Sequence, residues 1–277
     1  MLKTRVITAL VLLAVLLPIL YFANFAAFAV VATVFFGAAI WESFRLFKPE
    51  AAQAALLIAL FWTAAFVYAF FLAGRTPALF WFAISVLIWV LRFAPSLKIG
   101  LPPLASTANT LTSLTYAIAI VGCFAAIVAL FAHSPVYLLS VMVLVWIADI
   151  GAYFSGKAFG KHKLAPKISP GKSWEGAIGG CIAVLVLGSL SVVYGGPLFA
   201  NTFAVRVEHA FGWLALLAIL VLLVAFSIAG DLFESQLKRR AGMKDSSNLL
   251  PGHGGVLDRI DALIPVLPLA ALIGARL

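Results

Sequence analysis

The stretch from Ser235 to Asp261 combines acidic, basic and glycine residues in a way that suits phosphate chemistry. It holds eight of the 29 charged side chains of a chain of 277 residues. Carboxylates are the hard oxygen ligands that Mg²⁺ prefers, lysine and arginine neutralise phosphate groups, and glycine-rich loops let backbone amides approach an anion. The stretch therefore favours metal-assisted phosphate chemistry over a solvated loop.

The carboxylates of this stretch are spaced so that two helix ends can offer them to one cavity. If a helix continues through residues 231–240, Asp231 and Lys238 lie on one face, seven residues apart. After turn-forming residues, a second helix is expected to begin near Asp258, which puts Asp258 and Asp261 three residues apart on a common face. Between the two helices, His253 is flanked by glycines that permit positive φ and close approach to an anionic ligand.

Asp149 is a second candidate, because it lies about one turn before the end of an apolar run and shares a face with Tyr153. A carboxylate at this depth is costly unless it is paired, protonated or facing a polar cavity. The alternative interpretation is a hydrogen bond that packs two helices.

The following loop, KHKLAPKISPGKSWEG, gathers four lysines, among them Lys172. It is not a P-loop, because Pro166 stands where that motif needs glycine and no strand is expected before it. Ser173 can begin a helix whose amides face an anion, whereas the alternative is an ordinary basic loop at a membrane surface.

The elements that must position these residues are membrane helices. The chain is 64% hydrophobic and 10% charged, far from the composition of soluble domains. Apolar runs long enough to cross a bilayer recur throughout, and backbone groups in lipid must be satisfied within each segment. We therefore expect an all-α, polytopic membrane protein with about nine transmembrane helices, at 6–22, 25–43, 54–73, 78–94, 111–131, 135–154, 176–194, 212–232 and 260–276.

The basic residues predict the orientation of these helices. With nine crossings and a cytoplasmic N-terminus, every Lys and Arg except Arg75, Arg206 and Arg276 falls on the cytoplasmic side. The first run resembles a secretory signal, but it is longer than is usual for one, so we expect it to be retained. Cys123 and Cys181 lie within apolar runs and are expected to be packing thiols.

The acidic residues are distributed unevenly along the chain, which suggests two regions. Residues 1–148 contain only Glu42 and Glu50, which predicts a scaffold of membrane helices with possible oligomer contacts, and residues 149–277 are the expected catalytic region. The net charge of +9 is spread over loops, which favours anionic lipid headgroups over nucleic acid as partners.

The polar stretch resembles the signature of phosphatidate cytidylyltransferases of the bacterial type, also called CDP-diacylglycerol synthases. The matching positions are Ser235-x-Leu-Lys238-Arg239, Lys244-Asp245-x-Ser247 and Leu250-Pro251-x-His253-Gly254-Gly255-Val256-x-Asp258-Arg259-Ile-Asp261. The resemblance implies transfer of CMP from CTP to phosphatidic acid, giving CDP-diacylglycerol and pyrophosphate. It also implies Mg²⁺, in one or more ions, a homodimer, and a site on the cytoplasmic side of the bacterial inner membrane.

The roles follow from this resemblance together with the spacing. The expected catalytic residues are Asp231, Asp258, Asp261, Lys244 and His253, and the three aspartates are also the expected metal ligands. The expected substrate-binding residues are Lys238, Arg239, Arg259, Gly254, Gly255, Lys172 and Asp149. No general base is required, because a phosphate monoester is already anionic at neutral pH.

Two other classes of membrane protein remain as alternatives. Another lipid phosphotransferase or kinase would use the same chemistry, although the D-x-x-D-G-x-x-A-R pattern of CDP-alcohol phosphotransferases is absent because Asp261 is followed by Ala-Leu. A cation-coupled transporter would also place carboxylates in membrane helices, but it should show broken helices near the midplane and repeated halves.

Overall fold

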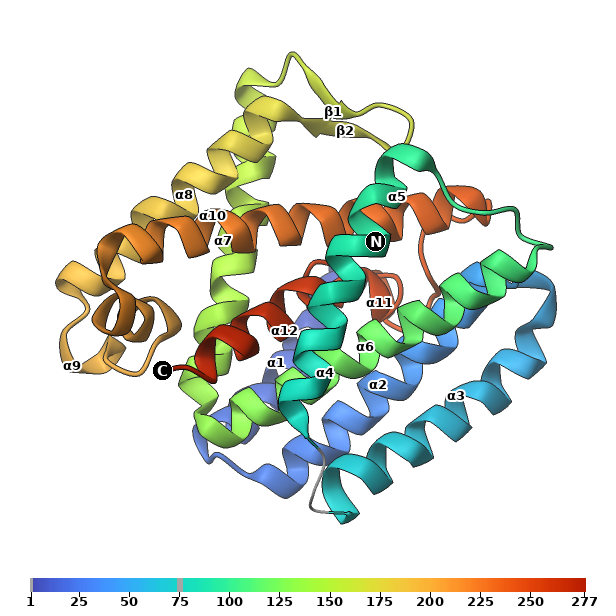
Figure 1. The fold of residues 1–277 in the computed structure, drawn as a ribbon, viewed down its shortest axis with the longest axis horizontal. Coiled ribbons are helices and arrows are strands. Elements are labelled where there is room, and N and C mark those ends of the chain that lie inside the picture. Colours follow the sequence, from blue (N-terminus) through green and yellow to red (C-terminus); the bar gives the residue numbers. More distant parts are fainter. Residues whose placement is uncertain (1, 74–76) are drawn as a thin grey trace.

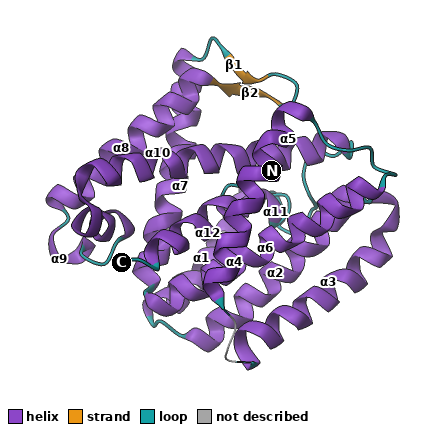
Figure 2. Cartoon of the chain, viewed as in Figure 1, coloured by secondary structure: helices purple, strands orange, loops and turns teal. Residues whose placement is uncertain are grey.

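A computed structural model describes residues 2–73 and 77–277, and it is almost entirely helical (Figures 1 and 2). The helices of the first half are α1 (Leu2–Tyr21), α2 (Phe25–Phe47), η1 (Pro49–Ala51), α3 (Ala52–Val67), η2 (Tyr68–Leu72), α4 (Ala78–Ile88), η3 (Trp89–Phe93), α5 (Ala94–Ile99) and α6 (Thr107–His133). The second half contains α7 (Pro135–Phe159), α8 (Trp174–Tyr194), α9 (Gly196–Phe199), α10 (Phe203–Arg240), α11 (Leu257–Ile260) and α12 (Leu263–Gly274). The predicted all-α class is confirmed.

Seven helical segments in the described ranges are long and apolar enough to cross a bilayer. They are Phe25–Phe47, Gln53–Leu72, Ala78–Ile99, Thr107–His133, Pro135–Phe159, Trp174–Tyr194 and Phe203–Arg240. Each predicted run coincides with a helix, but the first and last runs, in α1 and α12, fall outside these seven. The exact count of nine crossings therefore stays a prediction.

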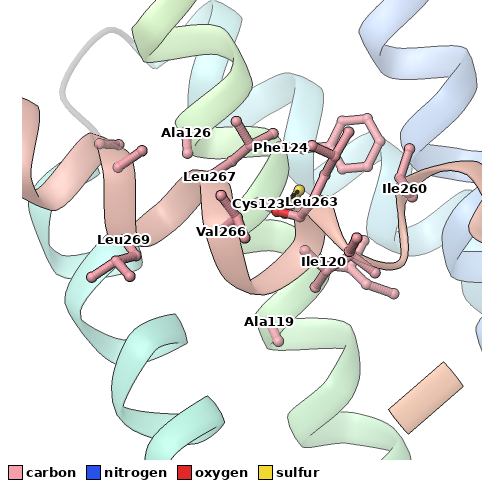
Figure 3. Packing of buried hydrophobic residues seen from close by; sticks show 14 of the residues in the cluster. Ala119, Ile120, Cys123, Phe124, Ala126, Ile260, Leu263, Val266, Leu267 and Leu269 are labelled. Carbon is pink, nitrogen blue, oxygen red and sulfur yellow. Dashed lines mark hydrogen bonds between the residues drawn. The ribbon is translucent and has the colours of Figure 1, made fainter. Parts of the chain in front are cut away.

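The last run differs most from its predicted form. Its main helix, α12, has 12 residues and contains Pro268, so it is about 18 Å long at 1.5 Å per residue, against about 30 Å of hydrocarbon. Its residues from Leu263 to Ala271 are all buried. Figure 3 shows Leu263, Val266 and Leu267 packed against α6. This helix is thus part of the protein core.

Close helix packing brings α7, α8 and α10 together. A Cβ atom on Gly180 of α8 would lie 2.5 Å from the backbone oxygen of Ala148 in α7, and one on Gly188 would lie 2.8 Å from the Leu220 side chain in α10. Neither approach leaves room for a larger residue. Both glycines therefore serve contacts between helices of the same chain.

The lysine-rich loop contains a hairpin that was not predicted. Strand β1 (Lys163–Ala165) pairs antiparallel with β2 (Ser169–Ser173), at the top of Figure 1. The loop must reverse direction to join α7 to the neighbouring α8, and pairing satisfies its backbone groups as it does so. The turn is closed by the Ile168 amide, which donates to the Ala165 oxygen at 3.1 Å.

Candidate active site

A cavity of about 560 Å³ lies between α7, α8, α10 and the hairpin. Asp149 and Tyr153 of α7 both line it, which confirms that they share a face. Lys172 enters from β2 and Asp231 from α10. The structure therefore brings together three of the predicted site residues from separate parts of the chain.

Lys172 and Asp231 form an ion pair inside this cavity. Lys172 is held in place because the adjacent Ser173 ends the hairpin and caps α8, accepting a hydrogen bond from the Gly176 amide at 3.2 Å. Glu175 secures the base of the hairpin by accepting from the His162 amide at 3.2 Å. The expected helix start at Ser173 is confirmed.

A second ionic cluster lies farther along α10, which continues to Arg240 as predicted. Lys238 forms ion pairs with Glu234, four residues earlier, and with Asp258 Oδ1 at 2.6 Å. Glu234 is completely buried and Lys238 is mostly so. The end of α10 is anchored by Arg240, which donates to the Pro102 oxygen at 2.8 Å. Lys238 therefore bridges two carboxylates of its own chain.

Asp258 fastens the segment 243–257, which we call the signature loop. Its Oδ2 atom accepts from the Ser246 and Gly255 amides, each at 2.8 Å, and it lies 2.8 Å from the Ser246 hydroxyl, whose single proton it shares with Glu42. Burial alone would raise the pKa of Asp258, but the hydrogen bonds from Lys238 and from these amides hold it below its ordinary value. Both oxygens of this carboxylate thus already have partners from the protein.

The turn within the signature loop uses its glycines as predicted. Gly252 and Gly254 have φ of +76° and +85°, a region that larger residues rarely adopt. The Leu250 amide donates to the Gly254 oxygen at 2.8 Å, and His253 Nδ1 is buried without a hydrogen-bond partner within the described ranges. Thr8 of α1 donates to the Pro251 oxygen at 2.8 Å, so α1 reaches the same turn.

Sequence reasoning missed Glu42 of α2, which is completely buried beneath the signature loop. Its two carboxylate oxygens accept four hydrogen bonds from that loop, from the Ser246 and Ser247 hydroxyls and from the Val256 and Leu257 amides. The available signal was that Glu42 is an acid within an apolar run, which calls for a partner.

Asp261 lies in the turn between α11 and α12 and accepts from the Ala262 amide at 2.8 Å. Burial, assisted by the negative charge of Asp231, raises the pKa of Asp261 to about 7. With Asp149, Asp231, Glu234 and Asp258, the two clusters hold five carboxylates against the ammonium groups of Lys172 and Lys238. The region therefore has an excess of acidic groups.

The remaining predicted residues are basic and lie at the surface. Arg239, Lys244 and Arg259 are exposed, and none of them makes an ion pair with another described residue. Lys244 also lines a separate surface pocket with Trp41 and Arg45. These three cations are thus available to an anion from solution.

Metal-binding potential can be judged from the same side chains. Within residues 2–73 and 77–277, no three His, Cys, Asp or Glu side chains are grouped closely enough to hold a metal ion by themselves. Mg²⁺ commonly uses only one or two protein carboxylates and completes its shell with water and substrate phosphate. The acidic excess around Asp231 and Asp261 suits that mode of binding.

Comparison with known proteins gives one family. A sequence model of the cytidylyltransferase family matches residues 3–276. The phosphatidate cytidylyltransferase of Haemophilus influenzae is 54% identical over 136 residues, which are 49% of this chain and 44% of that protein. The enzyme of the same name from Pseudomonas aeruginosa is 54% identical over 141 residues, 50% of this chain and 47% of its own. The Staphylococcus saprophyticus enzyme of the same name is 44% identical over 133 residues, 48% of this chain and 46% of its own. The chain thus spans about half the length of the curated relatives it matches.

Proposed function

Because the chain belongs to the cytidylyltransferase family, we propose that it transfers CMP from CTP to phosphatidic acid, forming CDP-diacylglycerol and pyrophosphate. The observation that carries this proposal is the cavity in which Lys172 and Asp231 form an ion pair between three membrane helices. It provides a cation and a carboxylate where a lipid phosphate and a nucleotide can meet.

The reaction brings two anions together. An oxygen of the lipid phosphate attacks the α-phosphorus of CTP, a new P–O bond forms, and the bond to pyrophosphate breaks. Lys172 would hold a phosphate group when it exchanges Asp231 for substrate, and the exposed Arg239, Lys244 and Arg259 would attract the triphosphate from solution. The chain's part in the reaction is to offset charge and to position the two substrates.

A divalent cation, with Mg²⁺ as the preferred ion, belongs to the proposal. Asp231, which lines the cavity, and Asp261 would hold it, since five carboxylates outnumber two lysines in this region. When bound, the ion would supply positive charge that stabilises the pyrophosphate leaving group. Asp258 is occupied by hydrogen bonds from the signature loop, so its role as a metal ligand stays a prediction.

We place the active site on the cytoplasmic side of a bacterial inner membrane, which the chain crosses several times. Lys157 of α7 and Lys172 of the hairpin line the cavity, and basic loops favour the cytoplasmic side. Thr8 of α1 contacts the signature loop, so the beginning of the described chain lies on the same side as that loop. Homodimer formation stays a prediction.

The test is turnover by the purified protein in detergent micelles or nanodiscs, given CTP and phosphatidic acid with and without Mg²⁺. We expect CDP-lipid and pyrophosphate in equal amounts, only when both substrates and the cation are present. A parallel assay with ATP and diacylglycerol tests the lipid-kinase alternative. Folded protein that forms phosphatidic acid there, and no CDP-lipid in the first assay, would overturn the proposal.

A further inference from the structure

We infer that Glu42 is a positioning residue for the candidate active site, which fixes the signature loop and, through Ser246, the carboxylate of Asp258. Glu42 belongs to α2, in the half of the chain predicted to be a scaffold. The effect on turnover rests on the proposed function, whereas the effect on the loop can be measured without it.

Among the described residues, the hydrogen bonds to the Glu42 side chain come from the signature loop. Oε1 accepts from the Ser247 hydroxyl at 2.5 Å and the Val256 amide at 3.0 Å, and Oε2 accepts from the Leu257 amide at 2.6 Å and the Ser246 hydroxyl at 3.0 Å. The donors are 204 to 215 residues away in the chain. One side chain thus joins both ends of the loop to a membrane helix.

The charge of Glu42 depends on these donors because it is not balanced by a cation. The carboxylate is fully buried in α2, and it forms no ion pair within the described part of the chain. A buried carboxylate without partners is strongly unfavourable, especially within a membrane. Leaving the observed loop conformation would therefore remove the hydrogen bonds on which this carboxylate relies.

Ser246 connects Glu42 to Asp258. Its hydroxyl oxygen lies 3.0 Å from Glu42 Oε2 and 2.8 Å from Asp258 Oδ2, and its amide donates to the same Asp258 oxygen. Gly255 passes so close that a Cβ atom there would be 2.4 Å from Glu42 Oε1 and 2.0 Å from Ser246 Oγ. The two carboxylates and the loop between them thus have little freedom to move independently, and displacing Glu42 displaces Asp258.

The first experiment compares Glu42→Gln with Glu50→Gln. Glutamine keeps the size of the side chain, but its NH₂ group cannot accept a hydrogen bond, so the amide of Val256 or Leu257 loses its partner. Glu50 is an exposed acid eight residues further along and serves as the matched control. For Glu42→Gln we expect kcat to fall at least tenfold, with KM for CTP within threefold of the wild-type value. Its thermal midpoint should fall by only a few degrees, the cost of one unpaired buried amide. Glu50→Gln should match the wild type.

The second experiment measures hydrogen exchange of residues 245–257 and does not require turnover. We expect hydrogen exchange in this segment to accelerate at least tenfold in Glu42→Gln, whereas the exchange rates of α6 and α12 should not change. Ser247→Ala removes one donor to Glu42 and also the acceptor of the Leu249 amide, and it leaves the carboxylate intact. Exchange should therefore accelerate at Val256 and Leu257 as well as at Leu249, and this variant replaces Glu42→Gln if that variant does not fold.

The outcomes separate the two proposals. Unchanged exchange in the signature loop, or accelerated exchange throughout the protein, would overturn the positioning role. If the wild-type protein lacks transferase activity, the proposed function fails, and the exchange measurement alone decides the role of Glu42. If kcat of Glu42→Gln falls only as far as the fraction of unfolded protein explains, Glu42 has a purely structural role and the inference is also overturned.

Discussion

At the scale of single residues, the two less exposed lysines of the candidate active site are already paired with acids. Lys172 pairs with Asp231, and Lys238 pairs with Glu234 and Asp258. A phosphate that binds to Lys172 therefore replaces an existing anion and gains less than it would from an unpaired ammonium group. The less buried pair, Lys172 with Asp231, is the better suited to such an exchange.

Replacing Asp231 tests that pair. In Asp231→Asn we expect kcat to fall by at least about 100-fold, the size of effect seen when one charged or hydrogen-bonding group is removed from an electrostatic site. Folding should be retained, because the amide is close in size to the carboxyl group. CDP-lipid formation measures the effect, and Glu208→Gln, at the opposite end of α10, is the control. Near-normal turnover in Asp231→Asn would contradict the role proposed for this aspartate.

The two ion pairs of Lys238 lead to a separate prediction about the free energy of unfolding. Lys238→Met leaves Glu234 and Asp258 without their shared cation, so we expect the protein to lose about 3–5 kcal/mol, as when one partner of a buried ion pair is removed. The exposed neighbour Arg239, replaced in the same way, should change stability by less than about 0.5 kcal/mol. Chemical unfolding in micelles gives both values, and equal losses for the two variants would be evidence against the bridge.

The sequence predicts which residues share a helix face but not the partners that they contact. The spacing predicts that Asp231 and Lys238 lie on one face, because helical spacing is local and visible in the sequence. Their partners, Lys172 for Asp231 and Asp258 for Lys238, come from other parts of the chain. Glu42 could not be assigned its partners, because they lie 204 to 215 residues away and leave no periodic pattern. Long-range hydrogen bonds of this kind appear only once the helices have been arranged in space.

At the scale of the elements, the cavity depends on close packing between α7 and α8. The Gly180 position is in contact with Ala148 and Ala152 of α7, and all three line the cavity. The helices approach closely because the residues between them are small. A larger residue at this contact would separate the helix carrying Asp149 from the helix that Ser173 caps.

Gly180→Val tests this contact. A Cβ atom would lie 2.5 Å from the Ala148 oxygen, so the helices must move apart, and we expect a loss of about 1–3 kcal/mol from overpacking together with reduced turnover. Ile182→Val, an exposed position on the same helix, should be nearly neutral. Unfolding midpoints of the two variants measure the difference, and an unchanged midpoint for Gly180→Val would show that the helices can adjust without cost.

The elements themselves were predicted well where hydrophobicity is continuous. All nine apolar runs became helices, because a backbone in lipid has few other ways to satisfy its hydrogen bonds. The hairpin was missed because Ser, Pro, Gly and Lys in β2 give no alternating apolar pattern. The break in α10 at Gly212, with φ +79° and ψ 174°, coincides with the predicted start of the 212–232 run. The last run is shortened because a turn at residues 261–262 separates α11 from α12, and the hydropathy of the run does not report that turn.

At the scale of the whole molecule, polar groups gather at one end. The hairpin follows the end of α7, whereas Tyr137 at the start of that helix packs near Gly274 close to the end of the chain (Figure 1). Arg206, one of the three basic residues predicted to face outward, donates to the Leu277 oxygen at 3.0 Å at this second end. Arg75, another of the three, lies outside the described residues. The separation of the two ends agrees with the predicted orientation, which itself stays a prediction.

Cysteine labelling tests that orientation. The background is a protein in which both native cysteines are replaced, by Cys123→Ala and Cys181→Ala. In this background we expect Leu198→Cys in α9 to react with an impermeant maleimide in intact spheroplasts. Lys167→Cys at the tip of the hairpin should react only after the membrane is opened. Neither position is covered by other parts of the protein. The reverse pattern would place the candidate active site outside the cell.

The hydrogen bonds between Glu42 and the signature loop also determine when, during synthesis of the chain, the site can form. Translation at about 5–20 residues per second separates the synthesis of Glu42 from that of Ser246, 204 residues later, by roughly 10–40 s. During that interval the nascent chain carries a membrane-embedded acid without the partners it has in the finished protein. The carboxylate gains all four hydrogen bonds only after Leu257 has left the ribosome, so completion of the site waits for α2 to meet a segment synthesised about 200 residues later.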